Sequence, residues 1–495
     1  MSKLSVLTID LGGTSGRGIV YSLEDGTLSA KTIGRFSTLP RSGAGRSQVN
    51  FDAILKNTER CISKALGEGF ALSSVGVDTW GLDVGLLDDR GQLLCMPVHY
   101  DDPLGAAGME QALKTCSAEE LFYRTGSQPN HTKSLFMLLA LRAEDPELFG
   151  KCRSVMNLSD LLNYRLCGEK CADKTIIGTT QLYSARTRRW DRELMESFGL
   201  DRELFGPETD AGRIIGRLDA SYGEVPLALT CGHDTACAFL TAGVSARRQE
   251  MLVSCGTRAL IGTVVPEPVI NSEMVRLGLT NETGFDGSTR LLKSCVGMSL
   301  FEKLKHELYG NDNSLSFAAI DGILGQAEPF GFLVDIEDDA LCTEAGVRAG
   351  IRRQLESRGC PVPETPAQYL RCVLESAACC WAHSIAGIRR ALGYSAGSFR
   401  VVGGGSHSGF LMQLLADLTG MRVLAGPSEA SSMGNALAQL YALGELSGVE
   451  QMQAIVNDSV SLREYIPGDG GRAAEAMGEY ALRIAALDRD QQLSC

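Results

Sequence analysis

Residues 4–21, LSVLTIDLGGTSGRGIVY, point most directly to the fold of this chain. Two apolar runs predict neighbouring strands, and the glycine-rich segment DLGGTSGRG (10–18) predicts a hairpin between them. Glycine permits positive φ angles, which let successive backbone N–H groups converge on an anion. Asp10 at the end of the first strand is suited to holding Mg²⁺ through water. The hairpin is therefore a candidate phosphate and metal site, although an ordinary glycine-rich turn explains the same residues.

Two widespread phosphate-binding motifs do not fit this hairpin. The lysine of the G-x-x-x-x-G-K-[ST] loop is missing, and a strand follows the glycines where a dinucleotide-binding turn has a helix. The segment therefore indicates neither a P-loop nor a Rossmann domain.

The order of strand, hairpin and helix occurs near the start of the chain and again after residue 250. Helical periodicity is predicted at 52–67 and 367–392, and the segment 117–205 is mainly helical. The remaining strands are predicted at 75–78, 82–87, 93–96, 251–254, 260–265 and 399–402. We expect an α/β protein with two domains of related design, which the sequence divides into 1–245, 246–450 and a C-terminal helical extension over 451–495.

Composition restricts the partners. The chain has 495 residues, of which 44% are apolar and 22% charged, which suits two folded domains. Its net charge of −13 leaves no basic stripe of the kind that neutralises a nucleic-acid backbone. No apolar run approaches the ~20 residues that span a bilayer, and residues 1–6 lead into a strand without an apolar leader. We expect a cytoplasmic protein with no nucleic-acid or membrane partner; its oligomeric state stays open.

The chain contains 16 cysteines, and their spacing does not indicate a zinc ribbon. The pairs Cys167 and Cys171, and Cys379 and Cys380, lack the C-x₂-C spacing, and most of the others fall inside apolar runs. We expect reduced thiols that fill the core.

The segment CGHDT (231–235) leads into an apolar helix. Glycine before the His-Asp pair lets the Asp234 carboxylate point out of the helix start, where it can accept a proton from a substrate hydroxyl. Aspartate and threonine are also among the commonest helix caps, so plain capping is the alternative interpretation.

Two further glycine segments lie in the second half of the chain. SCGT (254–257) has the chemistry of a second phosphate-contacting hairpin with Thr257 as donor, and a plain β-turn is the alternative. VVGGGSHSG (401–409) joins a strand to a helix, where three glycines let a planar base or a phosphate approach the backbone and the helix start. Ser408 replaces the third glycine of G-x-G-x-x-G, which argues against dinucleotide binding.

The four motifs occur in one order, two in each expected domain. That order resembles the FGGY family of carbohydrate kinases over about residues 4–445. Within this family, the stretches most similar to the rhamnulokinase subgroup are VGVDTWGLD (75–83), TTQLY (179–183), GHDTA (232–236) and AGPSEASSMGN (425–435). The resemblance implies two actin-like, ribonuclease H-like domains with a catalytic cleft between them.

The resemblance also implies ATP and Mg²⁺ as partners of a small sugar, with L-rhamnulose converted to L-rhamnulose 1-phosphate. It assigns proton abstraction to Asp234 and the metal to Asp10. The implied sugar-binding residues are Gly81, His233, Asp234, Thr235 and Ser294. The implied nucleotide-binding residues are Gly13, Thr14, Ser15, Gly16, Arg17, Thr257, Glu302 and Gly404.

Several positions depart from the subgroup's pattern. Arg258 replaces a usual Trp, Ser294 and Glu302 replace Asn and Gln, and Asp101 and Leu104 lie where arginines are expected. These changes put the identity of the sugar in question more than the reaction. The alternatives are a kinase for another ketose or polyol, such as fuculose or xylulose, and a non-catalytic nucleotide-dependent switch on the same fold.

Overall fold

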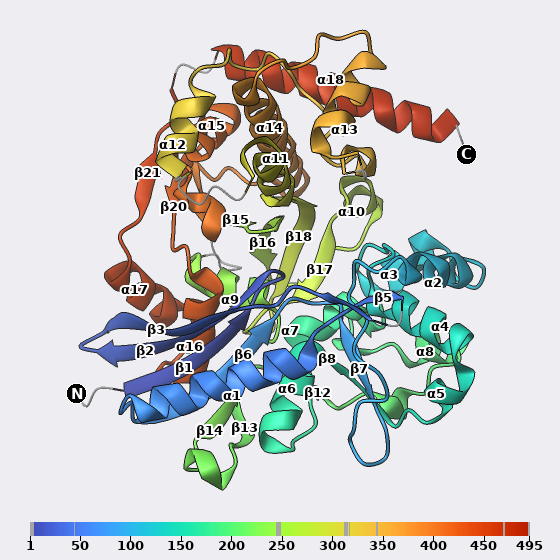
Figure 1. Cartoon of the computed structure of the whole chain (residues 1–495), viewed down its shortest axis with the longest axis vertical. Coiled ribbons are helices and arrows are strands. Elements are labelled where there is room, and N and C mark those ends of the chain that lie inside the picture. Colours follow the sequence, from blue (N-terminus) through green and yellow to red (C-terminus); the bar gives the residue numbers. More distant parts are fainter. Residues whose placement is uncertain are drawn as a thin grey trace. The chain divides into compact units, whose positions relative to one another are not determined.

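The computed structural model describes residues 4–43, 45–243, 249–310, 315, 317–342, 345–468 and 471–493 (Figure 1). They form two compact units that interleave along the chain. The first unit contains the chain up to residue 248 together with 264–292 and 430–460, and the second contains 249–263, 293–429 and the chain from 461 onward. The boundary expected between residues 245 and 246 lies outside the described residues, and the three-part division stays a prediction.

The first unit contains most of the strands. Its strands are β1 (Leu4–Leu11), β2 (Ser15–Glu24), β3 (Thr27–Ser37), β4 (Arg41–Gly43), β5 (Arg46–Gln48), β6 (Leu72–Thr79), β7 (Val84–Leu87), β8 (Ser154–Asn157), β9 (Ala172–Asp173), β10 (Tyr183–Ser184), β11 (Arg189–Trp190), β12 (Glu208–Thr209), β13 (Arg213–Arg217), β14 (Pro226–Leu229) and β17 (Thr280–Thr283). Its helices are α1 (Phe51–Gly67), α2 (Leu104–Leu113), α3 (Ala118–Thr125), α4 (Ser134–Glu144), α5 (Pro146–Gly150), α6 (Leu158–Cys167), α7 (Lys174–Ile177), α8 (Arg192–Ser197), α9 (Asp234–Thr241), α10 (Ser272–Leu277), α16 (Ala430–Ala442) and α17 (Val449–Ser459).

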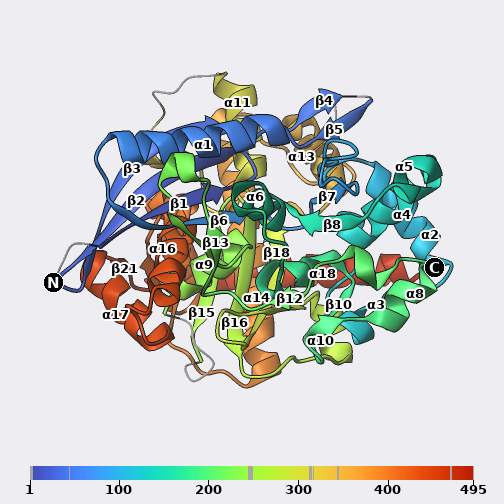
Figure 2. The ribbon, with the colours of Figure 1, turned by 90° about the horizontal axis from the view of Figure 1, so that it is seen from below.

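The central sheet of the first unit has the strand order β13-β14-β6-β1-β2-β3. The β1–β2 hairpin is antiparallel, as predicted, and β6 lies parallel to β1 on its other side. Side chains alternate across a strand, so Leu7 and Ile9 join the core under α1 and α6, while Val6 joins the core under α9 and α16 (Figure 2). The sheet is therefore covered by helices on both faces.

The secondary structure predicted for this unit from the sequence is confirmed in part. The predicted helix at 52–67 is confirmed as α1. The strand predicted from residue 82 begins only at Val84, because Leu82 has φ 82°, in the left-handed region that strand residues do not adopt. The strand predicted at 93–96 is wrong: Leu93 forms only an isolated bridge with Leu87, and the next residues bend away.

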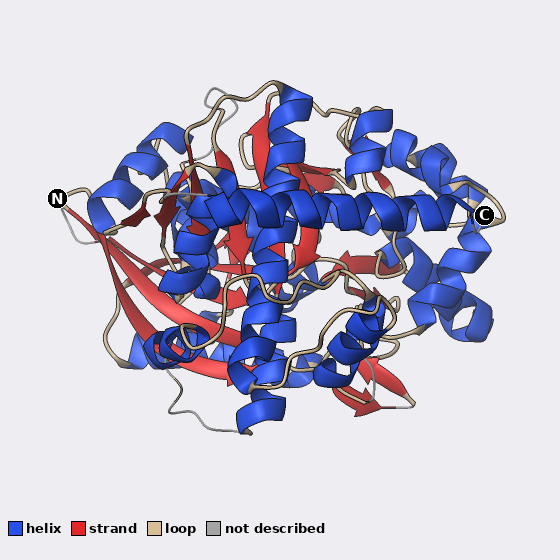
Figure 3. Ribbon diagram, turned by 90° about the horizontal axis from the view of Figure 1, so that it is seen from above, coloured by secondary structure: helices blue, strands red, loops and turns tan. Residues whose placement is uncertain are grey.

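The second unit has its own sheet and the longest helices. Its strands are β15 (Met251–Cys255), β19 (Ser398–Val402), β20 (Arg422–Ala425) and β21 (Arg463–Tyr465), while β16 (Arg258–Val265) and β18 (Thr289–Val296) carry the chain between the units. Its helices are α11 (Ser299–Tyr309), α12 (Phe317–Leu324), α13 (Val347–Glu356), α14 (Pro366–Leu392), α15 (Gly409–Thr419) and α18 (Gly471–Leu493), the last being the long helix that runs to the C-terminus in Figure 3.

The second sheet has the neighbour order β18-β16-β15-β19-β20-β21, and the first half of β18 pairs with β17 in the first unit. β15 pairs antiparallel with β16 and parallel with β19, and this repeats the pairing of β1 with β2 and β6. The strand predicted at 399–402 and the helix predicted at 367–392 are confirmed as β19 and α14.

Among the described residues, no helix is both long enough and apolar enough to cross a membrane.

Candidate active site

Two buried carboxylates lie side by side at the ends of β1 and β6. Asp10 and Asp78 are register partners on parallel strands, and their exposed fractions are 1% and 0%. Asp10 Oδ2 accepts a hydrogen bond from Arg17 Nε at 3.0 Å, and Asp78 Oδ2 accepts one from Asn435 Nδ2 at 2.6 Å. The Oδ1 atom of each has no hydrogen-bond partner among the described residues. Unpartnered carboxylate oxygens at one strand edge fit a hard divalent cation such as Mg²⁺.

Burial and the neighbouring Asp10 carboxylate raise the pKa of Asp78 well above its ordinary value. A bound cation would relieve this repulsion, because it favours the charged form of both groups. Asp78 was not among the residues singled out from the sequence, although it lies next to the end of a buried strand, as Asp10 does.

Helix α16 supports both strands with a row of polar side chains. Ser432 Oγ lies 2.6 Å from Thr8 Oγ1, and Gln439 Nε2 donates to the Leu7 carbonyl oxygen at 3.0 Å. A Cβ on Gly434 would lie 1.9 Å from the Cys237 carbonyl oxygen, so only glycine lets α16 approach α9 this closely. The AGPSEASSMGN segment, the most specific part of the resemblance, thus holds the strands and the helix that carry the carboxylates.

Asp234 is the first residue of α9. Its Oδ1 accepts hydrogen bonds from the Thr235 backbone N–H at 2.6 Å and from Thr235 Oγ1 at 3.2 Å. Its Oδ2 accepts none from the described residues, and the side chain is 25% exposed. Burial, with Asp10 adding to it, raises the pKa of Asp234. One oxygen is thus held in place and the other is open, as a proton acceptor requires.

A buried ionic chain lies behind this carboxylate. His233 Nε2 is 3.6 Å from Asp234 Oδ1, and His233 Nδ1 is 3.1 Å from Glu282 Oε2, which also contacts Arg290 Nη2 at 3.0 Å. Burial alone would raise the pKa of Glu282, but Arg290 and His233, with Lys133, lower it to about 2. An ionised carboxylate only accepts, so His233 Nδ1 carries a proton and directs Nε2 toward Asp234.

Gly81 lies in a tight turn after β6. A Cβ there would lie 2.9 Å from Thr179 Cγ2, and the Leu82 N–H donates to Thr179 Oγ1 at 3.1 Å. Trp80 Nε1 donates to Asp83 Oδ2 at 2.8 Å, and burial raises the pKa of Asp83 well above its ordinary value. The TWGLD and TTQLY stretches therefore pack against each other around Gly81.

The glycines of the first hairpin act differently from the prediction. None of Gly12, Gly13, Gly16 and Gly18 has a positive φ, so the expected left-handed concavity is wrong. A Cβ on Gly16 would lie 2.5 Å from Phe36 Cε2, and one on Gly18 would lie 2.8 Å from Cys61 Sγ. Close packing behind the strands therefore requires these two glycines.

The residues at the tip of the hairpin divide between solvent and Asp10. Thr14 and Ser15 are exposed, Gly13 is half-buried, and Arg17 is held by Asp10. The hydroxyls predicted to contact phosphate are thus accessible at the turn.

The second hairpin is fixed by the start of α11. Thr257 is exposed in the turn, and the Gly256 and Thr257 carbonyl oxygens accept the Met298 and Ser299 N–H groups at 2.9 and 3.3 Å. Arg258 Nε donates to Ser294 Oγ at 3.1 Å, so two departures from the subgroup pattern contact each other. Glu302 is exposed on α11 and forms an ion pair with Lys305.

Gly404 is the glycine of VVGGGSHSG (401–409) that has free space around its Cα atom. A Cβ on Gly403 or Gly405 would lie 2.7 Å from the Cys255 carbonyl oxygen or 2.0 Å from Cys255 Sγ, whereas one on Gly404 meets nothing within 4 Å. Asp321 Oδ2 accepts the Phe410 N–H at 3.3 Å at the start of α15. The Asp321 carboxylate therefore occupies the start of α15, where a phosphate was one of the two expected ligands. The other expected ligand, a planar base, can still approach the backbone at Gly404.

The predicted residues thus form two groups, one in each unit. Asp10, Gly13–Arg17, Gly81 and His233–Thr235 lie in the first unit, and Thr257, Ser294, Glu302 and Gly404 lie in the second. Glu282, Arg290 and Lys133 were missed, because no local motif surrounds them and their roles appear only when β17, β18 and α4 lie near His233.

Comparison with known proteins identifies the family. The model of the FGGY family of carbohydrate kinases, N-terminal domain, matches residues 5–241, and the model of the C-terminal domain matches residues 251–443. A curated rhamnulokinase of Bacteroides thetaiotaomicron is 33% identical over 473 residues, which cover 94% of this chain and 96% of the relative.

Solved structures agree on the fold. Gluconate kinase from Lactobacillus acidophilus matches with a TM-score of 0.81 at 15% identity over 98% of each chain. Xylulose kinase from Rhodospirillum rubrum matches with a TM-score of 0.78 at 19% identity over 99% of each chain. The predicted α/β class with two actin-like domains is confirmed. The chain belongs to the FGGY family of carbohydrate kinases, phosphotransferases that act on small sugars.

Proposed function

We propose that this enzyme transfers the γ-phosphate of ATP to a primary hydroxyl of a ketose, with L-rhamnulose as the first substrate and L-rhamnulose 1-phosphate as the product. One observation carries the chemistry: Asp234 has one oxygen fixed by Thr235 and the other free of any hydrogen bond among the described residues. That oxygen accepts the proton of the sugar hydroxyl as the hydroxyl attacks the phosphorus atom.

The neighbouring residues have separate parts in this proposal. His233, held by Glu282, orients the sugar hydroxyl toward Asp234. Asp10 and Asp78 provide the free oxygens that hold Mg²⁺, which would neutralise charge on the transferred phosphoryl group. Gly13 to Arg17, Thr257 and Glu302 contact the nucleotide, and Gly404 offers an open backbone to the adenine base. Gly81, Thr235 and Ser294 complete the sugar contacts.

The choice of L-rhamnulose rests on likeness. The relative that is 33% identical over nearly the whole chain is named a rhamnulokinase, and the TWGLD and GHDTA stretches are of that subgroup's kind. A net charge of −13 and reduced thiols support work in the cytoplasm with no nucleic-acid or membrane partner.

A second candidate is another ketose, such as fuculose or xylulose. The observation that favours it is the Arg258–Ser294 hydrogen bond, which engages the shortened side chain at an expected sugar contact. Restoring the longer amide by Ser294→Asn should change the preference among ketoses by ~10-fold or more and leave KM for ATP nearly unchanged.

The test is a coupled assay of ADP release across ketoses, 6-deoxyketoses and polyols, with Asp234→Asn as the inactive control. Saturable turnover on a 6-deoxyketohexose, fastest on L-rhamnulose, supports the proposal. Fast phosphorylation of glycerol with all ketoses inert would contradict it and leave only the family assignment.

A further inference from the structure

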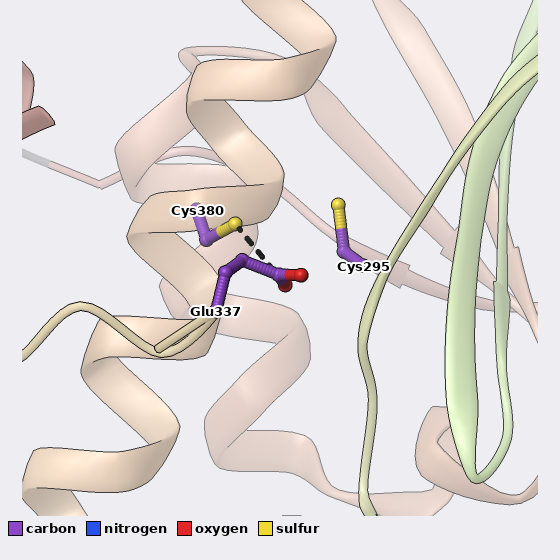
Figure 4. A group of neighbouring side chains, drawn as sticks. All are labelled: Cys295, Glu337 and Cys380. Atoms are coloured by element: carbon purple, nitrogen blue, oxygen red, sulfur yellow. Dashed lines mark hydrogen bonds between the residues drawn. The ribbon is translucent and has the colours of Figure 1, made fainter. Parts of the chain in front are cut away.

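Three side chains of the second unit, Cys295, Glu337 and Cys380, converge outside the candidate active site (Figure 4). Cys295 lies near the end of β18, Cys380 lies in the middle of α14, and Glu337 lies in the loop between α12 and α13. Their possible ligand atoms all lie within 4.8 Å of one another, and Cys380 Sγ is 3.9 Å from Glu337 Oε1. Segments far apart in the sequence thus bring two thiols and a carboxylate together.

We propose that this cluster binds one soft or borderline divalent cation of the zinc class, with two thiolates and one carboxylate as protein ligands and water in the fourth position. Tetrahedral zinc with ~2.3 Å bonds to sulfur and ~2.0 Å bonds to oxygen separates its ligand atoms by ~3.5–3.8 Å. The 3.9 Å between Cys380 Sγ and Glu337 Oε1 is close to these values, and the other two separations, both within 4.8 Å, need to contract by ~1 Å at most. Magnesium and calcium prefer oxygen ligands, so the donor set selects against them.

The surrounding contacts hold the ligands in position before a metal arrives. Glu337 Oε1 accepts the Val296 backbone N–H, and Trp381 Nε1 donates to the Val296 carbonyl oxygen at 2.9 Å. Cys295 Sγ also lies 3.7 Å from Ser384 Oγ. Such outer contacts orient metal ligands and limit the cost of assembling the site.

Burial and charge also suit a metal. The two cysteines are 0% and 5% exposed, while the Glu337 side chain is 34% exposed and gives the cation a path inward. Arg258 Nη2 lies 3.9 Å from Glu337 Oε2, and Lys293 is a second nearby cation among the residues that the structure describes. Two thiolates and a carboxylate carry three negative charges, which exceed the charge of these two cations.

The site adjoins the second hairpin. Cys295 directly follows Ser294, and Glu337 contacts Arg258, which directly follows Thr257. A cation that takes the Glu337 carboxylate therefore removes a partner of Arg258 and fixes the strand that carries Ser294. A disulfide between the two cysteines is the competing chemistry, and within the described part of the chain it would leave Glu337 with only its contacts to Val296 and Arg258.

Cobalt(II) is the probe, because its bonds to thiolate give charge-transfer absorption. The reduced full-length protein, freed of metal by a chelator, is titrated with cobalt(II) and then with zinc. We expect one tight equivalent with thiolate-to-cobalt absorption, displacement of cobalt by zinc, and a higher unfolding midpoint with zinc. Cys295→Ser and Cys380→Ser should abolish the absorption, and Glu337→Gln should weaken binding by ~10–100-fold.

The matched controls are Cys379→Ser, a buried cysteine next to Cys380 on the same helix, and Cys342→Ser, an exposed one. Both should bind cobalt like the unchanged protein. If the cysteine variants do not fold, the cobalt(II) affinity of Glu337→Gln is the deciding measurement. This variant is expected to fold, because the Glu337 side chain is partly exposed. Absence of a stoichiometric cobalt complex, absorption that survives in Cys295→Ser, or a Cys295–Cys380 disulfide with no metal uptake would each overturn the proposal.

Discussion

In the first unit, β1 ends near Asp10 and its parallel neighbour β6 ends near Asp78, whereas in the second unit the corresponding strands β15 and β19 end near Cys255 and Gly403. The two sheets share the same strand pairing, in which an antiparallel hairpin lies beside a parallel strand. They differ in chemistry at the strand ends: one presents carboxylates, the other a buried thiol against glycine backbone. In the proposed mechanism, the same topology provides metal and proton acceptors in one unit and an open backbone for the nucleotide in the other.

If the first unit carries the chemistry, Asp234→Asn should cause the greatest loss. The amide keeps the shape and the Thr235 hydrogen bonds but is a poor proton acceptor, so kcat should fall by ~10²–10⁴-fold while ATP still binds. Steady-state kinetics and nucleotide titration measure this. Asp219→Asn, a carboxylate that caps a surface turn, is the matched control, and near-normal turnover in Asp234→Asn would reduce the His-Asp pair to a helix start.

The stability of the protein in acid should depend on Glu282, a buried carboxylate of the first unit. The folded-state pKa of Glu282 is about 2 against an ordinary 4.5, so its stabilisation is present above about pH 4.5 and is lost as pH falls toward 2. The full effect is ~3 kcal/mol. Urea unfolding between pH 2 and 7 should show the difference between the unchanged protein and Glu282→Gln shrinking with acid.

The control for this experiment is Glu273→Gln on α10, where the side chain is 43% exposed. If the difference in unfolding free energy between the unchanged protein and Glu282→Gln stays constant with pH, Glu282 is not the ionised centre of the His233–Glu282–Arg290 cluster.

The two strand ends can be compared directly by the same substitution at each. Asp10→Ala should lower turnover by ~10–100-fold with every sugar alike, because it removes a metal-directed carboxylate. Cys255→Ala should leave turnover within a few-fold, since the thiol is buried against Gly405. A loss in Asp10→Ala that is confined to one sugar would speak against a role toward Mg²⁺·ATP.

The glycines of the second unit predict a smaller effect, on stability. Gly405→Ala would place a Cβ 2.0 Å from Cys255 Sγ and should cost ~1–3 kcal/mol of unfolding free energy. Gly404→Ala meets nothing within 4 Å and should change stability by less than ~0.5 kcal/mol, while raising KM for ATP. Denaturant midpoints test both, and Cys255→Ala should partly rescue Gly405→Ala; equal stability of the two glycine variants would refute the packing account.

The residues that sequence could predict are those beside a local signal. Asp10 and Asp234 each lie two residues from a glycine, Gly12 and Gly232, and beside an apolar run, so the sequence could single them out. Glu282 and Arg290 lie on β17 and β18, far along the chain from His233, and only tertiary pairing brings them behind it. The meeting of Cys295 with Cys380 was likewise invisible, because the sequence shows two cysteines in apolar runs and no paired spacing.

The glycines of the first hairpin show a different failure. Their presence was predictable as a special turn, but the physical reason was not, since the contact that excludes a Cβ at Gly16 comes from Phe36 on β3. Composition signals that glycine is needed, and only the packed structure tells whether φ or space requires it.

The placement of α16 has a consequence for synthesis on the ribosome. Residues 430–442 supply the partners of Thr8, Ser74 and Asp78 and pack against α9, yet they are translated after nearly all of the second unit. This face of the first sheet is therefore only partly covered, by α9, until the nascent chain is almost finished. A fragment that ends near residue 243 should be insoluble when expressed alone, and adding residues 430–460 as a separate peptide should recover it.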